Sequence, residues 1–317
     1  MSKIKNNHFS NFIATGVVFL SLLVIQCSGI KVETYYENGA AATASPIASD
    51  IAVEIFKQGG NAFDAAVAVG FVLAVVYPEA GNIGGGGFAV VREASSGKIT
   101  TLDFREKAPM AASESMFLDV DGQVIEQLST RGAKACGVPG TVTGLYSLWD
   151  TYGTMEWNEL VAYAAALADT GFIVDSFLAA SINEYSPDFL LFPQTAQTFL
   201  TNDQSISVGE RLTQKLLAKA LYIIAAEGPE GFYTGAIADS LVATMQANGG
   251  LITHEDLTAY NTVWREPIHF TFDSLDIYSM PPPSSGGIVI GQILKLIEPY
   301  DLSKYTVNSI KFISLFD

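Results

Sequence analysis

The sequence predicts one continuous α+β domain behind an N-terminal export segment. Helical patterns come first along the chain, a pair of short strands follows, and the remainder is mostly helical, an order typical of α+β proteins. No internal repeat and no Pro/Ser-rich linker divides the 317 residues. Hydrophobic residues make up 49% of the chain, so the composition excludes an intrinsically disordered protein.

Charge and composition exclude several classes of function. There are 33 acidic and 17 basic side chains, and the resulting net charge of −16 repels phosphate backbones, so we expect no nucleic-acid partner. The cysteines are Cys27 and Cys136, too few for a disulfide scaffold or a cysteine-built zinc site. The histidines are His8, His254 and His269, which argues against a histidine-rich metal centre. We therefore expect no bound metal.

Residues 1–27 are predicted to be a signal peptide. Lys3 and Lys5 give this segment a positive start, and an apolar run over residues 12–25 follows. That run has about 14 residues, whereas a helix that spans a bilayer needs about 20. The segment therefore indicates export to the bacterial periplasm or the membrane surface.

Cys27 closes the apolar run and resembles the acylated cysteine of bacterial lipoproteins. We expect Cys27 to be lipidated and to anchor the protein, although Gln26 stands where such signals usually carry a small residue. Cleavage near residues 40–42 and an uncleaved anchor helix are the alternatives. If Cys27 is lipidated, Cys136 has no disulfide partner, and we expect it to be a small buried hydrophobe.

Two helices begin the predicted domain. Ser45 is expected to cap a helix that starts at Pro46, with Gly59 ending it. Asn61 is expected to cap the second helix, with Asp64 at its third position facing the free amides of the first turn. This second helix is apolar on every side, so we expect it to be buried and to lie on a sheet.

The elements that follow are predicted from turn signals and periodicity. A glycine-rich loop over residues 81–87 leads into strands at 88–93 and 98–104, joined by a hairpin turn, and Arg105 follows the second strand. Later segments favour four helices, at about 141–149, 157–168, 212–226 and 232–247. A strand at about 270–280 and a last helix at about 288–297 follow.

The first candidate motifs favour structural roles. The glycine run over residues 84–87 could cradle a phosphate, but it lacks the Lys-Ser/Thr of a P-loop and a strand follows it. We therefore favour a turn where backbones pack closely. Ser284 and Ser285 lack a nucleophile elbow, and pairing either serine with His254 or His269 gives a weak signal for a catalytic triad.

Arg105 is the strongest candidate for binding. Its planar guanidinium can hold a carboxylate through two parallel hydrogen bonds. The alternative is a surface ion pair with Glu106 or another nearby acid, and the residue alone does not decide between the two.

Taken together, ordered blocks over residues 40–302 resemble the gamma-glutamyltransferases (gamma-glutamyltranspeptidases). The blocks with this resemblance are Gly59–Ala68, Pro78–Phe88, Leu102–Pro109, Gly137–Thr141, Tyr152–Trp157, Gly231–Gly235, Gly249–Thr253, Asp256–Leu257, Tyr260 and Pro281–Gly287.

The resemblance implies an N-terminal-nucleophile hydrolase fold, with two stacked sheets between helices (αββα). Such precursors cut themselves into a large and a small subunit. The threonine that then begins the small subunit attacks the gamma-glutamyl amide of glutathione, with its own amine as base, and the acyl group passes to water, an amino acid or a peptide. The resemblance implies no cofactor. It matches Arg105 to the arginine that binds the substrate α-carboxylate.

One block of the family pattern does not occur in this sequence. The nucleophile lies in a Gly-Thr-Thr-His block downstream of residues 281–287, and the 317 residues contain no such block. We therefore expect residues 28–317 to be a large-subunit domain that is incomplete at its C-terminus. By itself this domain should be inactive and poorly soluble, and it should need a small subunit.

Two other functions remain open at this point. A cephalosporin or glutaryl acylase shares the implied architecture, although Arg105 favours an amino-acid-bearing acyl group. The chain could also be a non-catalytic fragment or a binder of gamma-glutamyl compounds.

Overall fold

The computed structural model describes residues 39–200, 205–306, 309 and 314. The signal-peptide and lipidation predictions, including Cys27, lie outside these residues. The chain divides into Met1–Ala40 and a compact unit over Ala41–Asp317, and the helices and strands described below belong to the second unit. Among the described helices, none combines the length and the hydropathy that crossing a bilayer requires.

The first two helices are α2 (Pro46–Lys57) and α3 (Ala62–Val76). Ser45 stands at the N-cap of α2 as expected, but its side chain makes no capping hydrogen bond. The predicted cap of α3 is confirmed. Asn61 Oδ1 accepts from the backbone N–H of Asp64 at 3.0 Å, and Asp64 Oδ2 accepts from the N–H of Asn61 at 2.8 Å.

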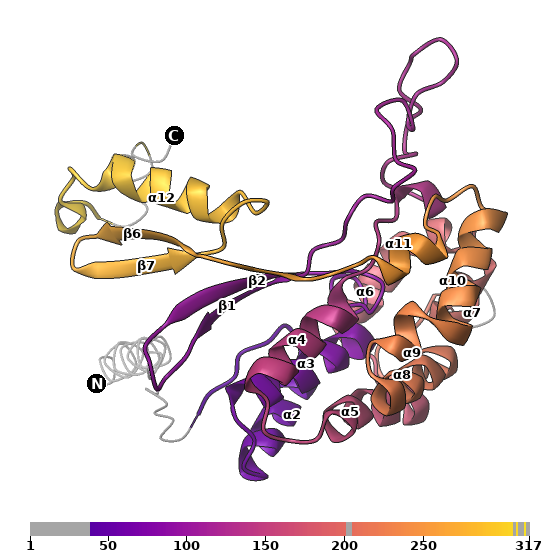
Figure 1. Ribbon diagram of the computed structural model, residues 1–317, viewed down its shortest axis with the longest axis horizontal. Coiled ribbons are helices and arrows are strands. Elements are labelled where there is room, and N and C mark those ends of the chain that lie inside the picture. The colour runs from indigo at the N-terminus through magenta and orange to yellow at the C-terminus, as the bar shows by residue number, and fades with distance from the viewer. Residues whose placement is uncertain (1–38, 201–204, 307–308, 310–313, 315–317) are drawn as a thin grey trace, which may run out of the picture. The chain divides into compact units, whose positions relative to one another are not determined.

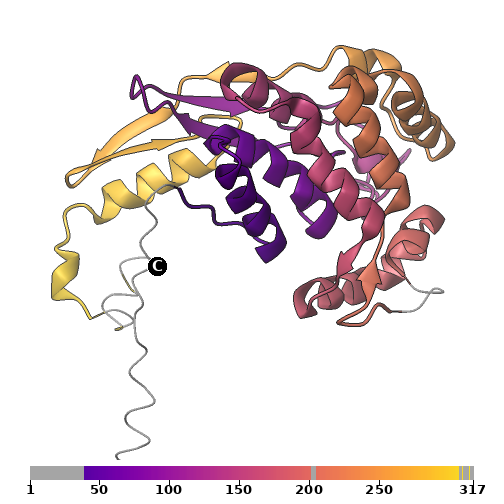
Figure 2. The ribbon, with the colours of Figure 1, turned by 90° about the horizontal axis from the view of Figure 1, so that it is seen from below.

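Helix α3 is buried along most of its length, as its apolar sequence predicts. Its main neighbours, however, are the helices α2, α4 (Thr141–Tyr152) and α5 (Trp157–Thr170), which lie beside it in Figure 2. Val91 and Leu102, on the strands described next, are buried in the same core cluster as α3, so the expectation that α3 lies on a sheet stays a prediction.

The central sheet has three strands in the order β1-β2-β5. Strands β1 (Phe88–Arg92) and β2 (Ile99–Asp103) form the predicted antiparallel hairpin. Strand β5 (Val263–Arg265), which the sequence did not reveal, pairs with the other edge of β2 and sets Thr101 opposite Arg265. This pairing brings a segment from late in the chain beside Arg105.

The helices after α5 differ from the prediction at their boundaries. The helix expected from residue 212 begins at Lys215, because Arg211–Leu212 forms strand β4 and pairs with β3 (Phe172–Ile173). The helix expected over 232–247 is two helices that break at Thr234. The remaining elements of this region are α6 (Ser176–Phe189), α7 (Pro193–Phe199), α8 (Lys215–Glu227), α9 (Glu230–Tyr233), α10 (Gly235–Ala247) and α11 (His254–Thr258).

The single strand expected over 270–280 is a hairpin of β6 (Ile268–Phe272) and β7 (Leu275–Ser279). Asp273 makes the turn with φ of 53°, a conformation that aspartate tolerates better than most residues. The last predicted helix is confirmed as α12 (Gly286–Ile297), which lies along the hairpin in Figure 1. The short 3₁₀ helix η2 (Leu302–Lys304) follows it.

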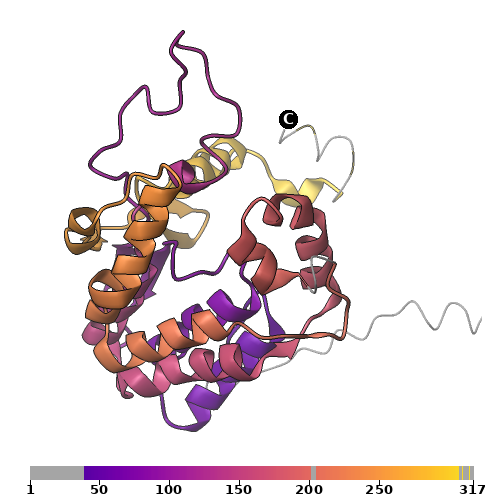
Figure 3. The same ribbon diagram turned by 90° about the vertical axis from the view of Figure 1, so that its right-hand side faces the viewer.

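Residues 108–137 form a long excursion between β2 and α4. A backbone pair between Lys107 and Val138 closes its base, and the segment projects away from the helices in Figure 1 and Figure 3. It contains the 3₁₀ helix η1 (Ala133–Ala135). Cys136 lies here and is exposed, so the prediction of a buried cysteine is wrong, because the excursion packs little around itself. Partial desolvation nevertheless raises the pKa of its thiol.

Candidate carboxylate-binding site

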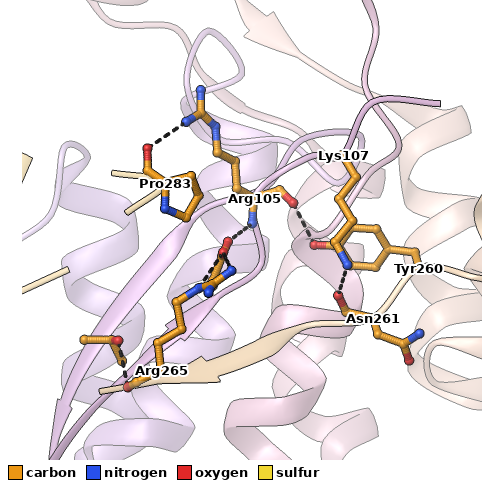
Figure 4. Close-up of polar contacts among 8 residues, drawn as sticks. Arg105, Lys107, Tyr260, Asn261, Arg265 and Pro283 are labelled. Atoms are coloured by element: carbon orange, nitrogen blue, oxygen red, sulfur yellow. Dashed lines mark hydrogen bonds and ion pairs between the residues drawn. The ribbon is translucent and has the colours of Figure 1, made fainter. Parts of the chain in front are cut away.

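The backbone of Arg105 is held on both sides. Phe104 exchanges two backbone hydrogen bonds with Gly87, at 3.0 and 3.2 Å, so Arg105 is the first residue past the β1–β2 ladder. Its N–H donates to Asp103 Oδ1 at 3.1 Å. Its carbonyl accepts from the Tyr260 hydroxyl at 2.8 Å, as Figure 4 shows. Two side chains therefore fix the position from which the Arg105 side chain departs.

The Arg105 guanidinium itself is nearly free. The residue is exposed, and Nη1 lies 3.5 Å from the carbonyl oxygen of Pro283, a long contact that Figure 4 draws. Within the described part of the chain Arg105 joins no ion pair, so the alternative of a surface pair with Glu106 is wrong there. The guanidinium has five N–H donors, and the Pro283 carbonyl is a weak partner for one of them. An exposed cation of this kind suits an external anion.

The Asp103 carboxylate, which accepts from the Arg105 N–H, is already engaged by another residue. Arg265 donates to Asp103 Oδ2 from Nε at 3.0 Å and from Nη2 at 2.9 Å. The Asp103 side chain is only 10% exposed and that of Arg265 is 36% exposed. Thr101 Oγ1 in turn donates to the Arg265 carbonyl at 3.0 Å. The pair spans β2 and β5 and is a fixed part of the sheet.

Tyr260 is fixed by its neighbours as well. The residue is 6% exposed, and its ring stacks on Tyr233 with centroids 5.9 Å apart and planes 8° from parallel. Lys107 places Nζ 4.9 Å from the ring centroid and donates to the carbonyl of Asn261 at 2.7 Å. Burial, together with negative charge nearby, raises the pKa of Tyr260, so its hydroxyl stays protonated and remains a donor.

The glycine run allows the backbones around Arg105 to approach closely. A Cβ on Gly86 would lie 2.5 Å from the Phe104 carbonyl oxygen, and one on Gly140 would lie 2.1 Å from that oxygen and from the Tyr260 hydroxyl. Gly85 accepts from the N–H of Gly140 at 2.7 Å. The interpretation of the run as a close-packed turn is therefore confirmed.

Arg105 borders a cavity of about 490 Å³. The glycine loop forms one wall, and the two ends of the excursion, including Met116, Phe117 and Lys134, form the others. A separate cavity of about 530 Å³ between the end of α3 and α6 contains the carboxylate of Glu79 and no basic side chain. An anionic ligand is therefore better matched to the cavity at Arg105.

The serines and histidines do not form a triad in the described residues. Ser284 Oγ accepts from the N–H of Gly286 at 3.3 Å. His254 lies 3.4 Å from Asp239 and His269 lies 2.8 Å from Asp276, so both histidines face acids. Across the ranges that the structure describes, no three His, Cys, Asp or Glu side chains gather as metal ligands would.

Sequence reasoning found Arg105 but missed Asp103, Tyr260 and Arg265 as its supports. Tyr260 stood out only as part of the family pattern, without a role. Asp103 carried one local signal, since an aspartate side chain often accepts from the backbone N–H two residues on. Nothing local connected Arg265 to this site.

The fold and the site together place the chain among the N-terminal-nucleophile hydrolases. The crystal structure of Helicobacter pylori gamma-glutamyltranspeptidase superposes with a TM-score of 0.87 and 42% identity, covering 89% of this chain and 81% of that chain. The family model described as gamma-glutamyltranspeptidase matches residues 48–316. The chain belongs to the gamma-glutamyltranspeptidase family.

Curated relatives agree on the family and differ in the activity they are named for. The glutathione hydrolase proenzyme of Pseudomonas sp. (strain A14) is 43% identical over 309 residues, which are 96% of this chain and 53% of that protein. The acylase ACY 1 proenzyme of Pseudomonas sp. (strain V22) is 37% identical over 271 residues, 84% of this chain and 48% of that protein. The chain thus spans about half the length of these relatives.

Proposed function

We propose that this chain is the large-subunit part of an enzyme that cleaves gamma-glutamyl amides such as glutathione. The enzyme transfers the gamma-glutamyl group to water or to amino acids and peptides. The observation that carries this proposal is the unpaired guanidinium of Arg105 on a fixed backbone. Relatives named glutathione hydrolase proenzyme support the choice of substrate.

In this proposal Arg105 binds the α-carboxylate of the substrate. Its two terminal nitrogens match the two carboxylate oxygens, which sets both the position and the rotation of the glutamyl group. The threonine nucleophile and the groups that stabilise the oxyanion come from a small subunit outside this sequence. The large-subunit part therefore contributes orientation, holding the amide where the nucleophile can reach it.

The acylase-like function is the second candidate, because one relative is named an acylase. A glutaryl group and a gamma-glutamyl group both end in a carboxylate, so Arg105 can bind either. What separates them is the α-ammonium group, which only the gamma-glutamyl group carries. Comparing kcat/KM for a gamma-glutamyl anilide and a glutaryl anilide distinguishes the two, and we expect the former to be the better substrate.

The test of the carboxylate contact uses Arg105→Met and Arg105→Lys in the full-length protein that contains this chain. Replacing a bidentate charged pair should lower kcat/KM for the gamma-glutamyl anilide about 100-fold in the methionine variant. The lysine variant should recover part of the loss, because it keeps the charge but not the fork. A methionine variant within twofold of the wild type would contradict the role proposed for Arg105.

We also propose that residues 1–27 carry a lipoprotein-type signal that is cleaved just before Cys27, and that residues 28–317 form the large-subunit domain. The apolar run and Cys27 are the sequence features that support this. Mass spectrometry of protein expressed in a bacterium should find an acylated N-terminal Cys27, and Cys27→Ser should abolish the lipid. An unmodified N-terminus downstream of Cys27 would contradict the anchor.

A further inference from the structure

We propose that Tyr260 and the Asp103–Arg265 pair are positioning residues that keep the Arg105 guanidinium free and correctly placed for a carboxylate. This inference rests on the proposed function, in which Arg105 binds the substrate α-carboxylate. It assigns a role to three residues that do not themselves touch the substrate.

The backbone of Arg105 is held at both of its polar groups. A residue just past the end of a ladder normally bonds to water and can change its φ and ψ. Here its N–H donates to the Asp103 side chain at 3.1 Å, and its carbonyl accepts from the Tyr260 hydroxyl at 2.8 Å. Both bonds must break before the root of the Arg105 side chain can move.

The side chains that hold the Arg105 backbone are themselves fixed by their neighbours. Tyr260 is buried in a ring stack, and Asp103 is gripped by the two-nitrogen fork of Arg265. Tyr260 and Arg265 lie at the two ends of one short segment that enters β5 and pairs with β2. Because the segment is part of the sheet, the supports move only with the sheet.

The charge of Asp103 also bears on Arg105. Asp103 is the last residue of β2, Arg105 follows two residues later, and the Asp103 carboxylate accepts from the Arg105 backbone N–H at 3.1 Å. An Asp103 carboxylate released from Arg265 could pair with the Arg105 guanidinium and would then block an incoming anion. Arg265 occupies Asp103 Oδ2, and the Arg105 N–H occupies Oδ1. The pair with Arg265 therefore keeps the Asp103 carboxylate from binding the Arg105 guanidinium.

The test measures a discrimination ratio in the full-length protein. This ratio is kcat/KM for the gamma-glutamyl anilide divided by kcat/KM for the same anilide with a neutral carboxamide in place of the α-carboxylate. A general loss of structure lowers both rates and leaves the ratio unchanged, whereas a misplaced or blocked Arg105 lowers the ratio.

The matched pair is Tyr260→Phe and Tyr233→Phe. Each change removes one buried hydroxyl from the same ring stack, but the Tyr233 hydroxyl donates to the Pro139 carbonyl at 2.8 Å and not to Arg105. Tyr260→Phe should lower the ratio about fivefold, mainly through KM, as expected for one lost hydrogen bond. Tyr233→Phe should leave the ratio unchanged. Equal ratios in the two variants would overturn the role of Tyr260.

Arg265 is tested by rescue. Arg265→Met frees the Asp103 carboxylate to pair with the Arg105 guanidinium. This pairing should lower the ratio about tenfold. Adding Asp103→Asn removes the competing charge and should restore most of the loss. If the ratio of the double variant were no higher than that of Arg265→Met, the proposed role of Arg265 would be overturned. An unchanged ratio in Arg105→Met would instead refute the proposed function, and the two failures are distinguishable.

Discussion

Arg265 on β5 donates two hydrogen bonds, at 3.0 and 2.9 Å, to a single oxygen of Asp103 on β2. The pair ties together strands that lie about 160 residues apart in sequence, and only one of its side chains is well buried. The same contact that joins the sheet also satisfies the charge next to Arg105. Under the proposed function, this one contact would therefore serve both the stability of the sheet and the binding of the substrate carboxylate.

Breaking this pair from one side should be costly. Asp103→Asn leaves the Arg265 cation facing a neutral amide, and we expect a loss of about 2 kcal/mol in the free energy of unfolding. Arg265→Met should lower the free energy of unfolding by a similar amount. The double variant should lose less than the sum of the two single losses, and the difference, the coupling energy of the pair, should be about 1–2 kcal/mol. Urea denaturation measures all three.

The control for that cycle is the exposed pair Lys215–Asp169, whose side chains are 62% and 46% exposed. Asp169→Asn should change the free energy of unfolding by less than about 0.5 kcal/mol. If the losses of the Asp103→Asn and Arg265→Met variants simply added in the double variant, the hydrogen bonds between these two side chains would contribute nothing to stability.

Gly140 should tolerate no side chain. An alanine Cβ there would lie 2.1 Å from the Phe104 carbonyl oxygen and from the Tyr260 hydroxyl, and neither can move without disturbing Arg105. We expect Gly140→Ala to destabilise the fold by about 2 kcal/mol or more, and to lower its melting temperature. Gly84→Ala is the control, because its Cβ would meet only Asn82 Oδ1, at 3.7 Å. Equal melting temperatures for the two variants would contradict the close packing.

Local sequence signals predicted the start of the fold well. Asn61 and Asp64 carry the cap of α3 within four residues, and the turn between β1 and β2 is equally local. The β6–β7 hairpin was missed because its turn has no glycine or proline, and Asp273 adopts the left-handed conformation instead. Helix α6 was missed because Pro187 lies inside it.

The candidate site was predictable only in part, for a physical reason. Arg105 is recognisable because its neighbours in sequence form a pattern. Its supports are not, because Tyr260 and Arg265 reach it through strand pairing that joins distant segments. Strand register of this kind depends on the whole sheet, and no single segment encodes it.

Asp64 should make stability depend on pH in the acid range. Burial of its side chain opposes ionisation, but hydrogen bonds from the Thr154 hydroxyl and from three backbone N–H groups outweigh burial and lower the pKa below 3.8. A carboxylate with a lowered pKa stabilises the fold above its unfolded pKa. That contribution disappears as the pH falls through the folded pKa.

We therefore expect Asp64→Asn to lose about 2 kcal/mol at pH 7, since an amide cannot accept from all four donors. The difference from the wild type should stay constant down to about pH 5 and shrink below the ordinary aspartate pKa of about 3.9. Urea denaturation at several pH values measures it. The exposed residue Asp50 on α2 supplies the control variant Asp50→Asn, which should match the wild type. A constant difference down to the lowest accessible pH would contradict the linkage.

The surface of α12 should limit the solubility of the 317-residue chain. Five apolar side chains on this helix, which we call the α12 patch, are 43–73% exposed: Ile288, Val289, Ile290, Ile293 and Leu296. Gly287 and Ile297 are the only buried residues of α12. Clustered exposed apolar surface of this kind favours self-association, whereas single exposed residues do not.

A matched pair of leucines tests this. Leu296 in the α12 patch is 73% exposed and Leu216 on α8 is 71% exposed, so a change to lysine removes almost equal apolar area at the two positions. If clustering is what matters, Leu296→Lys should raise the soluble concentration of the 317-residue chain roughly twofold, and Leu216→Lys should have little effect. Light scattering at increasing concentration measures this, and unchanged melting temperatures should accompany it. Equal gains from both variants would mean that total exposed area controls solubility and that the α12 patch has no special part in it.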